Sequence, residues 1–215
     1  MILDADQVRG LYRRIAPFYD LSLIPFRALG DRRNRLLAVR SLRLQAGDTV
    51  VDLGCGTGIN IPLLLEAVGP SGRVIGVDLS KEMLSNALER VQRLRADNVN
   101  LVVADLREWD LPACIDAALA TFSLEMIPEY DLVIRTIATR LRTEGHLVSY
   151  GLKHPDRWPR WLVSLSIILL KPFGVSHDYA SFRPWESMGR HLRAVDFRER
   201  MLGAAYVCSA KAPAS

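Results

Sequence analysis

The stretch "VVDLGCGTGIN", residues 50–60, decides how this chain folds. It opens with two valines, reaches an acid at Asp52, and then places glycines at alternate positions, Gly54, Gly56 and Gly58. The apolar run predicts a short buried strand. Glycine adopts backbone conformations that other residues avoid, so the three glycines predict a tight loop whose backbone can approach a ligand closely. The stretch therefore predicts a binding loop directly after a strand, with a carboxylate beside it.

The rest of the chain continues this alternation of strands and helices. Strands are expected at 49–53, 73–78, 100–105, 114–127, 144–151, 197–201 and 204–210, and helices at 59–68, 80–95 and 129–141. Strands that alternate with helices predict a parallel sheet covered on both faces, and the last close pair predicts an antiparallel hairpin at the sheet edge. The predicted fold is α/β: a Rossmann-like, doubly wound sheet of seven strands, mostly parallel.

The length of 215 residues fits a single domain, and a hydrophobic content of 49 % argues against disorder. We expect a single domain over 1–215 with four parts: an N-terminal helical lid (1–44), a core (45–151), an insertion (152–192) and terminal strands (193–215).

The net charge of +4 is mildly basic, and without a clustered patch it gives no support for a specific nucleic-acid partner. The excess gathers at two places. Residues 1–46 hold nine arginines against four acids, and residues 151–200 hold nine basic residues against five acids. These segments suit an anionic surface or substrate, and solvated arginines on helix faces are the alternative.

Three cysteines, at 55, 114 and 208, lie far apart and form no CxxC pair, so neither a disulfide framework nor a zinc site is expected. The four histidines also stand at irregular spacings, and we expect no metal site. No apolar run approaches the roughly 18–20 residues of a membrane span. These features predict a cytoplasmic protein.

Acids follow three strands. Asp78 comes 20 residues after Gly58, where an acid can accept hydrogen bonds from ribose hydroxyls. Asp105 ends the next predicted strand and could accept a bond from an adenine amine. A dinucleotide fingerprint would need glycine at Ile59, and Asp52 would repel a pyrophosphate. The pattern favours a ligand with an ammonium or sulfonium group, a ribose and an adenine.

This pattern resembles the class I S-adenosylmethionine-dependent methyltransferases over residues 45–151, through "VVDLGCGTG", "VIGVDLS", "VVAD" and "DAALATFSLEMIPE". The resemblance implies S-adenosyl-L-methionine as cofactor. It also implies that the cofactor's amino acid end lies over the glycine loop and its ribose at Asp78. The cofactor-binding residues that it implies are Asp52, Gly54, Cys55, Gly56, Thr57, Gly58, Asn60, Asp78, Leu79, Met83, Asp105, Leu106 and Thr121.

The segment "LYRRIAPFYD", residues 11–20, resembles the N-terminal part of the branch that includes phospholipid N-methyltransferases and quinone-biosynthesis methyltransferases. There a tyrosine-bearing helix covers the cofactor, which makes Tyr12 and Tyr19 candidates for a lid. An amphipathic helix that merely buries the two rings is the alternative.

Many members of this branch carry a His-His pair after the fourth strand, where this chain has Glu125 and Met126. A carboxylate or a tyrosine could assist an amine acceptor, so Glu125 and Tyr19 are the catalytic candidates. An exposed glutamate at a helix start is the alternative role for Glu125.

The insertion contains an apolar run, residues 162–170, flanked by Trp158 and Trp161 at one end and Lys171 at the other. Tryptophan and basic residues at the edges of an apolar segment fit a membrane interface. A cap helix buried on the sheet is the alternative. Further along the chain, Arg183, Arg190 and His191 are candidates for binding an anionic head group.

Together these features predict a methyltransferase that acts on an amphiphilic small molecule at the inner face of a membrane, as a peripheral protein of lipid metabolism. A phospholipid with an amine head group is the first choice of acceptor. A quinone precursor and a soluble natural product follow. Rivals of another class are a nucleotide-binding oxidoreductase and a non-catalytic cofactor-binding protein. The sequence leaves the oligomeric state open.

Overall fold

The computed structural model describes residues 5–22, 30–171 and 181–213. The helices are α1 (Ala5–Ile15), α2 (Tyr19–Ser22), α4 (Asp31–Ser41), α5 (Ile61–Val68), α6 (Lys81–Leu94), α7 (Tyr130–Arg140), α8 (Arg160–Leu170) and α9 (Pro184–His191). Short 3-10 turns are η1 (Ala16–Phe18), η2 (Leu124–Met126) and η5 (Met201–Gly203). The strands are β1 (Thr49–Leu53), β2 (Arg73–Asp78), β3 (Val99–Val103), β4 (Ile115–Thr121), β5 (Leu141–Leu152), β6 (Arg193–Arg200) and β7 (Ala205–Lys211).

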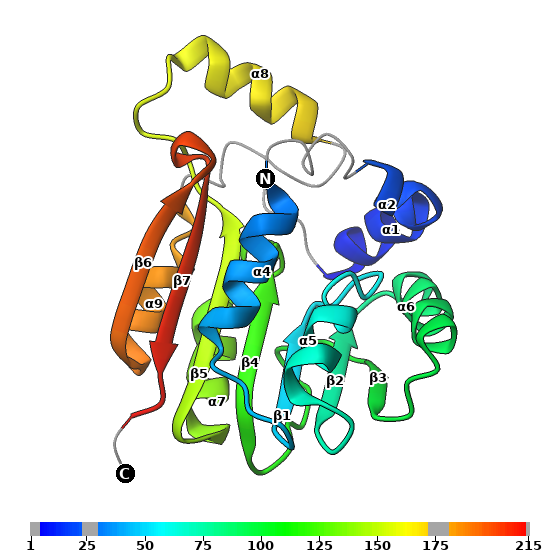
Figure 1. Ribbon diagram of the computed structural model, residues 1–215. Coiled ribbons are helices and arrows are strands. Elements are labelled where there is room, and N and C mark those ends of the chain that lie inside the picture. The colour runs from blue at the N-terminus through cyan, green and yellow to red at the C-terminus, as the bar shows by residue number, and fades with distance from the viewer. Residues whose placement is uncertain (1–4, 23–29, 172–180, 214–215) are drawn as a thin grey trace.

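The seven strands form one sheet in the order β3-β2-β1-β4-β5-β7-β6 (Figure 1). Strands β1 to β5 pair in parallel, and β7 lies antiparallel between β5 and β6. The order reverses at β1, because β2 lies on one side of it and β4 on the other. The predicted fold class is therefore confirmed, and the reversal places a ligand crevice at the carboxyl end of β1.

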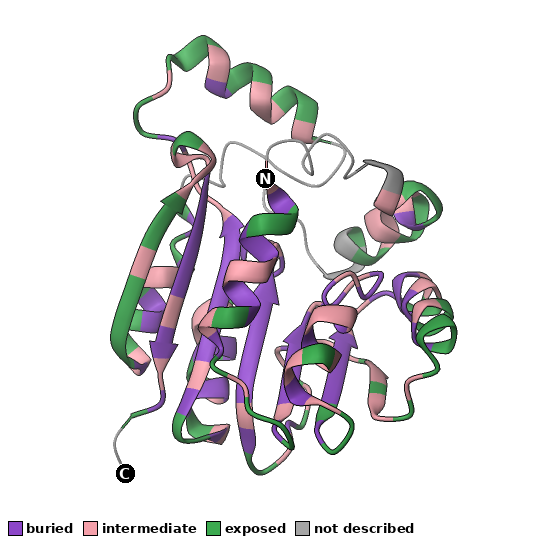
Figure 2. Cartoon of the chain, viewed as in Figure 1, coloured by how far each residue is buried: buried purple, intermediate pink, exposed green. Residues whose placement is uncertain are grey.

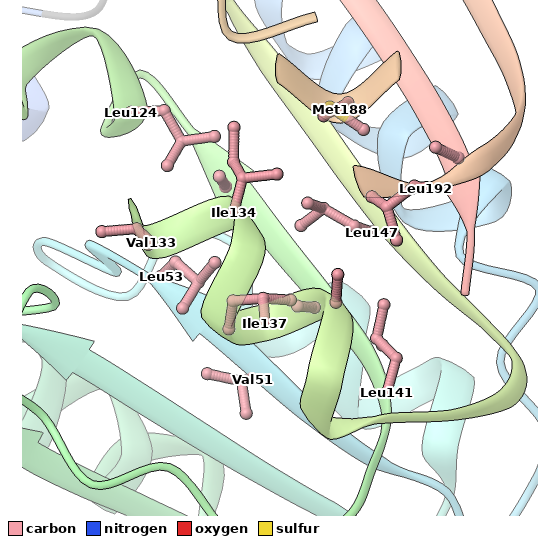
Figure 3. Close-up of a cluster of buried hydrophobic side chains, with 14 of the residues drawn as sticks. Val51, Leu53, Leu124, Val133, Ile134, Ile137, Leu141, Leu147, Met188 and Leu192 are labelled. Carbon is pink, nitrogen blue, oxygen red and sulfur yellow. The ribbon is translucent and has the colours of Figure 1, made fainter. Parts of the chain in front are cut away.

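Helices cover both faces of the sheet. On one face, α4 and α5 bury Ala38, Leu42 and Leu64 against strand residues such as Val50. On the other face, α7 and α9 bury the cluster drawn in Figure 3, which includes Ile134, Ile137 and Met188. The central strands are buried almost throughout because helices lie on both of their faces (Figure 2).

Most predicted elements agree with the structure, and the differences lie at their ends. Strand β3 ends at Val103, so Asp105 stands two residues past the strand instead of closing it. Strand β5 already begins at Leu141. The helix predicted to start at Ser80 is confirmed with its cap, because the Ser80 hydroxyl accepts a hydrogen bond from the Met83 N–H.

The parts outside the core divide differently from the prediction. Helix α4 packs on the sheet. Of the described residues before it, α1, η1 and α2 lie over the carboxyl edge of the sheet, where α1 and η1 contact α6 (Figure 1). Within the predicted insertion, α9 packs against α7 as part of the helical layer on the sheet, whereas α8 stands away from the sheet. No helix among the described residues combines the length and apolar character needed to cross a bilayer.

Candidate functional site

A cavity of about 340 Å³ opens at the carboxyl ends of β1, β2 and β4. This volume falls in the range of about 300–1,000 Å³ that small-molecule sites occupy. Ten of the predicted cofactor-binding residues line it: Tyr12, Tyr19, Gly54, Gly56, Asp78, Leu79, Met83, Asp105, Leu106 and Thr121. Five others do not line it: Asp52, Cys55, Thr57, Gly58 and Asn60. The topology thus brings together side chains from positions 12 to 121 of the sequence.

The glycine loop turns the chain from β1 into α5 with left-handed backbone conformations. Gly56 has a φ of +55° and borders the cavity, and a Cβ atom there would point to within 3.8 Å of the Met83 methyl group. Any other residue at this position would be strained and would stand at the cavity wall. The predicted close approach of backbone and ligand is therefore possible at Gly56.

Asp78 is fixed at the end of β2 by two backbone amides. Its Oδ2 accepts a hydrogen bond from the Gly56 N–H at 2.8 Å, and its Oδ1 accepts one from the Ser80 N–H at 2.9 Å. Burial raises the pKa of this carboxyl, and the amide hydrogen bonds act in the opposite direction. Each oxygen can accept a second bond, so the carboxylate can hold hydroxyl groups in the cavity.

Asp52 lies behind the cavity wall. It is fully buried, and both its oxygens accept from the Asn60 side-chain amide at 3.2 Å. Burial raises the pKa of Asp52 to about 7. The expected direct contact between this acid and a cationic ligand group is therefore corrected, because Asn60 stands against the carboxylate and neither residue reaches the cavity.

Asn60 connects Asp52 to a buried arginine that the sequence did not reveal. Arg35 of α4 is 5 % exposed, and its Nη1 donates to Asn60 Oδ1 at 2.9 Å and to Thr121 Oγ1 at 3.1 Å. Its Nε donates to Asp31 Oδ2, also at 2.9 Å. Since Thr121 lines the cavity, this network fixes the cavity floor. The spacing of Asp31 and Arg35, four residues apart on one helix, could have indicated an ion pair. The other arginines of this helix made Arg35 indistinguishable from exposed ones.

The N-terminal segment is attached to the glycine loop. Thr57 Oγ1 donates to Asp20 Oδ1 at 2.6 Å, and Arg90 Nη2 donates to Asp20 Oδ2 at 2.5 Å. Asn86 of α6 donates to the Ala16 carbonyl at 2.9 Å. Thr57 therefore contacts the segment over the loop instead of the cavity. Asp20 and Arg90 were not predicted, because nothing local marks residues 70 positions apart as partners.

Tyr12 and Tyr19, carried by this segment, lie together on the cavity wall with ring centroids 6.1 Å apart. Burial raises the pKa of Tyr19 to about 12 and that of Tyr12 well above its usual value. Both phenols are protonated at neutral pH. They can donate hydrogen bonds to a ligand, but neither is available as a base.

Asp105 is held by an arginine at the cavity mouth. Arg107 donates from Nε to Asp105 Oδ1 at 3.0 Å and from Nη2 to Oδ2 at 2.7 Å. This contact lowers the pKa of Asp105 and keeps it ionised. Oδ2 retains room for a further donor. Arg107 and Arg9 both line the cavity and were missed by the sequence prediction.

Glu125 is buried, so the expectation of an exposed glutamate at a helix start is wrong. Its Oε1 accepts a hydrogen bond from the Tyr206 hydroxyl at 2.8 Å, and its Oε2 has no hydrogen-bond partner among the described residues. Burial raises the pKa of Glu125 to about 7. The carboxyl rests on Gly151, and Ser123 and Met126 line the cavity whereas Glu125 does not.

The predicted acceptor residues divide into two groups. Arg190 Nη2 and His191 Nε2 both contact Asp131 Oδ1, at 2.7 and 3.1 Å, and so join α9 to α7. A hydrogen bond from Ser187, together with these contacts, holds the pKa of Asp131 well below its usual range. Arg190 and His191 therefore pair with Asp131 at this helix contact and do not line the cavity. This corrects the expectation that they bind an anionic head group.

The other group belongs to the stretch around α8. Trp161 is 68 % exposed, Ile168 is 67 % and Leu169 is 66 %, whereas Val163 is the one buried residue of this helix. Trp158 donates from Nε1 to the Leu202 carbonyl at 3.0 Å, and the exposed Arg183 pairs with Glu186. The alternative of a cap helix buried on the sheet is therefore wrong for the described part of this stretch.

Comparisons with known proteins find similarity to methyltransferases. The family described as methyltransferase domain matches residues 50–145. A demethylmenaquinone methyltransferase of Listeria welshimeri is 30 % identical over 73 % of this chain, which spans 66 % of that relative's length.

Two solved structures share the fold. A SAM-dependent methyltransferase from Aquifex aeolicus is 20 % identical with a TM-score of 0.58, and the match covers 98 % of this chain and all of that one. Phosphoethanolamine N-methyltransferase 2 of Haemonchus contortus, in complex with phosphomonomethylethanolamine and S-adenosylhomocysteine, is 16 % identical with a TM-score of 0.66. That match covers 84 % of this chain and 53 % of the other.

Proposed function

The chain belongs to the class I S-adenosylmethionine-dependent methyltransferases, and we propose that it transfers the methyl group of that cofactor to an amphiphilic acceptor at an anionic membrane surface. The main support for an amphiphilic acceptor is the exposed apolar face of α8, which stands beyond the carboxyl ends of the strands (Figure 1). The main support for the cofactor is the lining of the cavity.

The cavity fits S-adenosylmethionine in three places. Gly56 provides a wall without a side chain, Asp78 offers a fixed carboxylate to hydroxyl groups, and Met83 and Leu79 provide apolar contacts for a flat ring. The cofactor supplies a methyl group that its sulfonium already activates. The protein therefore has to align the acceptor and exclude water.

Tyr12 and Tyr19 are proposed to exclude water from the cavity. Both rings border the cavity, and the segment that carries them is held to the loop by Asp20. As protonated phenols they can also orient the acceptor by hydrogen bonding. Tyr19 is thus a catalytic candidate as a donor.

Glu125 is proposed to accept the proton that an amine or hydroxyl acceptor must lose. Within the described part of the chain its Oε2 accepts no hydrogen bond, and a carboxyl pKa of about 7 suits a base at neutral pH. Reaching the acceptor requires the wall at Ser123 and Met126 to open by a side-chain movement. Tyr206 donates a hydrogen bond to the other oxygen and so stabilises the ionised carboxylate, which is the form that accepts a proton.

Helix α8 supports an amphiphilic acceptor. Its 11 residues would extend about 16 Å, too short to cross a bilayer but suited to lying in its interface. Exposed basic residues stand at both ends, Arg157 and Arg160 before the apolar run and Lys171 after it. Exposed tryptophan and leucine between cations favour an anionic membrane surface as the partner.

A lipid with an amine head group and a quinone precursor are both compatible with this site. The quinone precursor is supported by the similarity to the demethylmenaquinone methyltransferase of Listeria welshimeri. Both acceptors combine a small reactive head with an apolar remainder.

The decisive experiment follows labelled methyl from S-adenosylmethionine into vesicles that contain either phosphatidylethanolamine or demethylmenaquinone. We expect label in one of the two lipids, identified by product mass, and reduced transfer by Asp78→Ala when the cofactor is not saturating. Calorimetric titration with S-adenosylhomocysteine and with NAD runs beside it. Binding of S-adenosylhomocysteine without label in either lipid would refute the acceptor and leave the cofactor intact. Binding of NAD alone would refute the cofactor.

A further inference from the structure

A second cavity, of about 310 Å³, lies at the end of the sheet opposite the first. It is lined by the end of α4 and by residues of β5, β6 and β7, among them His146. His146 pairs with Ala117 in the register of β4 and β5, four positions before the Tyr150–Thr121 pair at the cofactor end. Four strand residues span about 13 Å, so the two cavities are separate.

The lining is predominantly cationic. Arg40, Arg43, Arg198 and Lys211 contribute four positive groups, and Asp196 is the one acid. Asp196 pairs with Arg198 at 2.8 Å, and Lys211 pairs with Glu144 at 2.6 Å.

Arg40 and Arg43 have no ion pair with any residue that the structure describes. Both are exposed, and they approach the cavity from α4 and the turn that follows it. Two guanidinium groups without counter-ions beside a cavity form a recognition surface for a planar or tetrahedral anion, since each can donate two parallel hydrogen bonds.

We propose that this second cavity binds a phosphate-bearing ligand through Arg40, Arg43 and Lys211. The Ser209 hydroxyl, also on the lining, would supply a neutral donor. The site lies away from the exposed apolar face of α8 and thus on the side of the sheet that would face away from a membrane (Figure 1). This location favours a soluble phosphomonoester over a lipid head group.

His146 reports on the charge of this cavity. Burial lowers its pKa, and the positive charges of Arg43, Lys211 and Arg142 lower it further. Arg142 faces Asp48 and Asp116 and is already paired. A bound anion would offset these cations, so it should raise the pKa of His146.

The test titrates the full-length protein with glycerol 3-phosphate at constant ionic strength and follows the His146 ring resonance by NMR, assigned with His146→Gln. We expect a saturable shift and a raised His146 pKa. Arg40→Ala and Arg43→Gln should each weaken binding roughly tenfold, the loss expected for one charge-assisted contact. Arg73→Ala removes an exposed arginine from the same end of the sheet but outside the cavity, and should leave binding unchanged.

Two further arms complete the test. Potassium chloride at the same ionic strength separates specific binding from screening, and phosphatidate vesicles separate a lipid head group from a soluble source. An equal shift with chloride, or unchanged affinity in both cavity variants, would overturn the proposal. Binding to the vesicles but not to glycerol 3-phosphate would overturn the soluble source.

Discussion

Asp20 and Thr57 are joined by a 2.6 Å hydrogen bond between Oδ1 and Oγ1, although 37 positions separate them in the sequence. The bond attaches the tyrosine-bearing segment to the glycine loop, and Arg90 strengthens it from α6 by contacting both residues. The tyrosine-bearing segment (the cover, residues 5–22) and the glycine loop are therefore joined, and a change in either should alter how fast a ligand is released.

Asp20→Ala should speed the loss of S-adenosylhomocysteine while the sheet stays folded. The Asp20 side chain is 42 % exposed, so solvent weakens its ion pair with Arg90, and we expect about a threefold to tenfold faster release. Stopped-flow displacement measures this rate. Asp97→Ala, which changes an exposed acid in the turn between α6 and β3, is the matched control. Equal release from both variants would show that the cover does not retain the ligand.

Asp78→Ala should weaken S-adenosylhomocysteine binding by roughly 1–3 kcal/mol, the usual cost of removing a hydrogen bond to a charged group. Because Asp78 also holds the Gly56 amide, thermal unfolding must be measured beside calorimetry. Asp78→Asn keeps one carbonyl acceptor and should lose less. Normal affinity in Asp78→Ala would remove this residue from the ligand site.

Gly56→Val should affect binding more than Asp78→Ala. Gly56 needs a φ of +55°, which valine rarely adopts, and its Cβ would stand at the cavity wall. Gly189→Val is the control, because Gly189 has no neighbour within 4 Å of an added Cβ. Calorimetry should find ligand binding lost in the first variant and kept in the second. Full binding by Gly56→Val would mean that the ligand does not approach this loop.

The sequence predicted the fold and the cavity wall because their signals are local. A strand that ends at a glycine loop, and acids after successive strands, can be recognised within ten residues, and parallel topology then brings Gly56 and Asp78 together. The partners of charged residues could not be predicted in this way. Arg35 meets Thr121, and Glu125 meets Tyr206, only because the sheet places distant segments beside each other.

Burial was the second quantity that the sequence did not provide. Asp52 and Glu125 look like accessible acids in a linear pattern, but the first is enclosed by Asn60 and the second by β5 and β7. The exposure of α8 was equally open beforehand, because an apolar run of nine residues fits a buried helix and an interfacial one alike.

Glu125 should make the stability of the protein depend on pH. Burial raises the pKa of its carboxyl from 4.5 to about 7. Between these values the native state keeps a proton that the unfolded chain has lost, so the free energy of unfolding falls as pH rises. The contribution is on the order of 3 kcal/mol. Urea titrations from pH 4.5 to 7.5 should find a smaller decline in Glu125→Gln than in the wild type.

Asp52 is expected to act in the same direction, since burial raises its pKa to about 7 as well. Asp52→Asn is therefore a second variant with a reduced decline. Glu186→Gln, which changes an exposed glutamate, is the control and should follow the wild type. Parallel curves for Glu125→Gln and the wild type would show that Glu125 ionises normally.

The exposed face of α8 should bind anionic vesicles. Trp161 and Ile168 are both about two-thirds exposed, whereas Trp158 has a structural hydrogen bond to the Leu202 carbonyl. The double change Trp161→Ser and Ile168→Ser therefore removes apolar surface without disturbing that contact. At about 25 cal/mol per Å² of buried surface, a partial loss from two large side chains amounts to roughly a tenfold weaker association. Co-sedimentation with phosphatidylglycerol vesicles measures it.

Charge separates this expectation from unspecific adhesion. Each basic residue near an anionic surface contributes about 1 kcal/mol at most, so binding of the wild type should rise with anionic lipid and fall with salt. Leu88→Ser changes a leucine of α6 that is 49 % exposed and should leave sedimentation unaltered. Cofactor affinity should stay the same in all variants, because α8 does not line the cavity. If the wild type does not co-sediment with anionic vesicles at low salt, α8 is not a membrane contact. A soluble apolar molecule then becomes the proposed acceptor in place of a lipid.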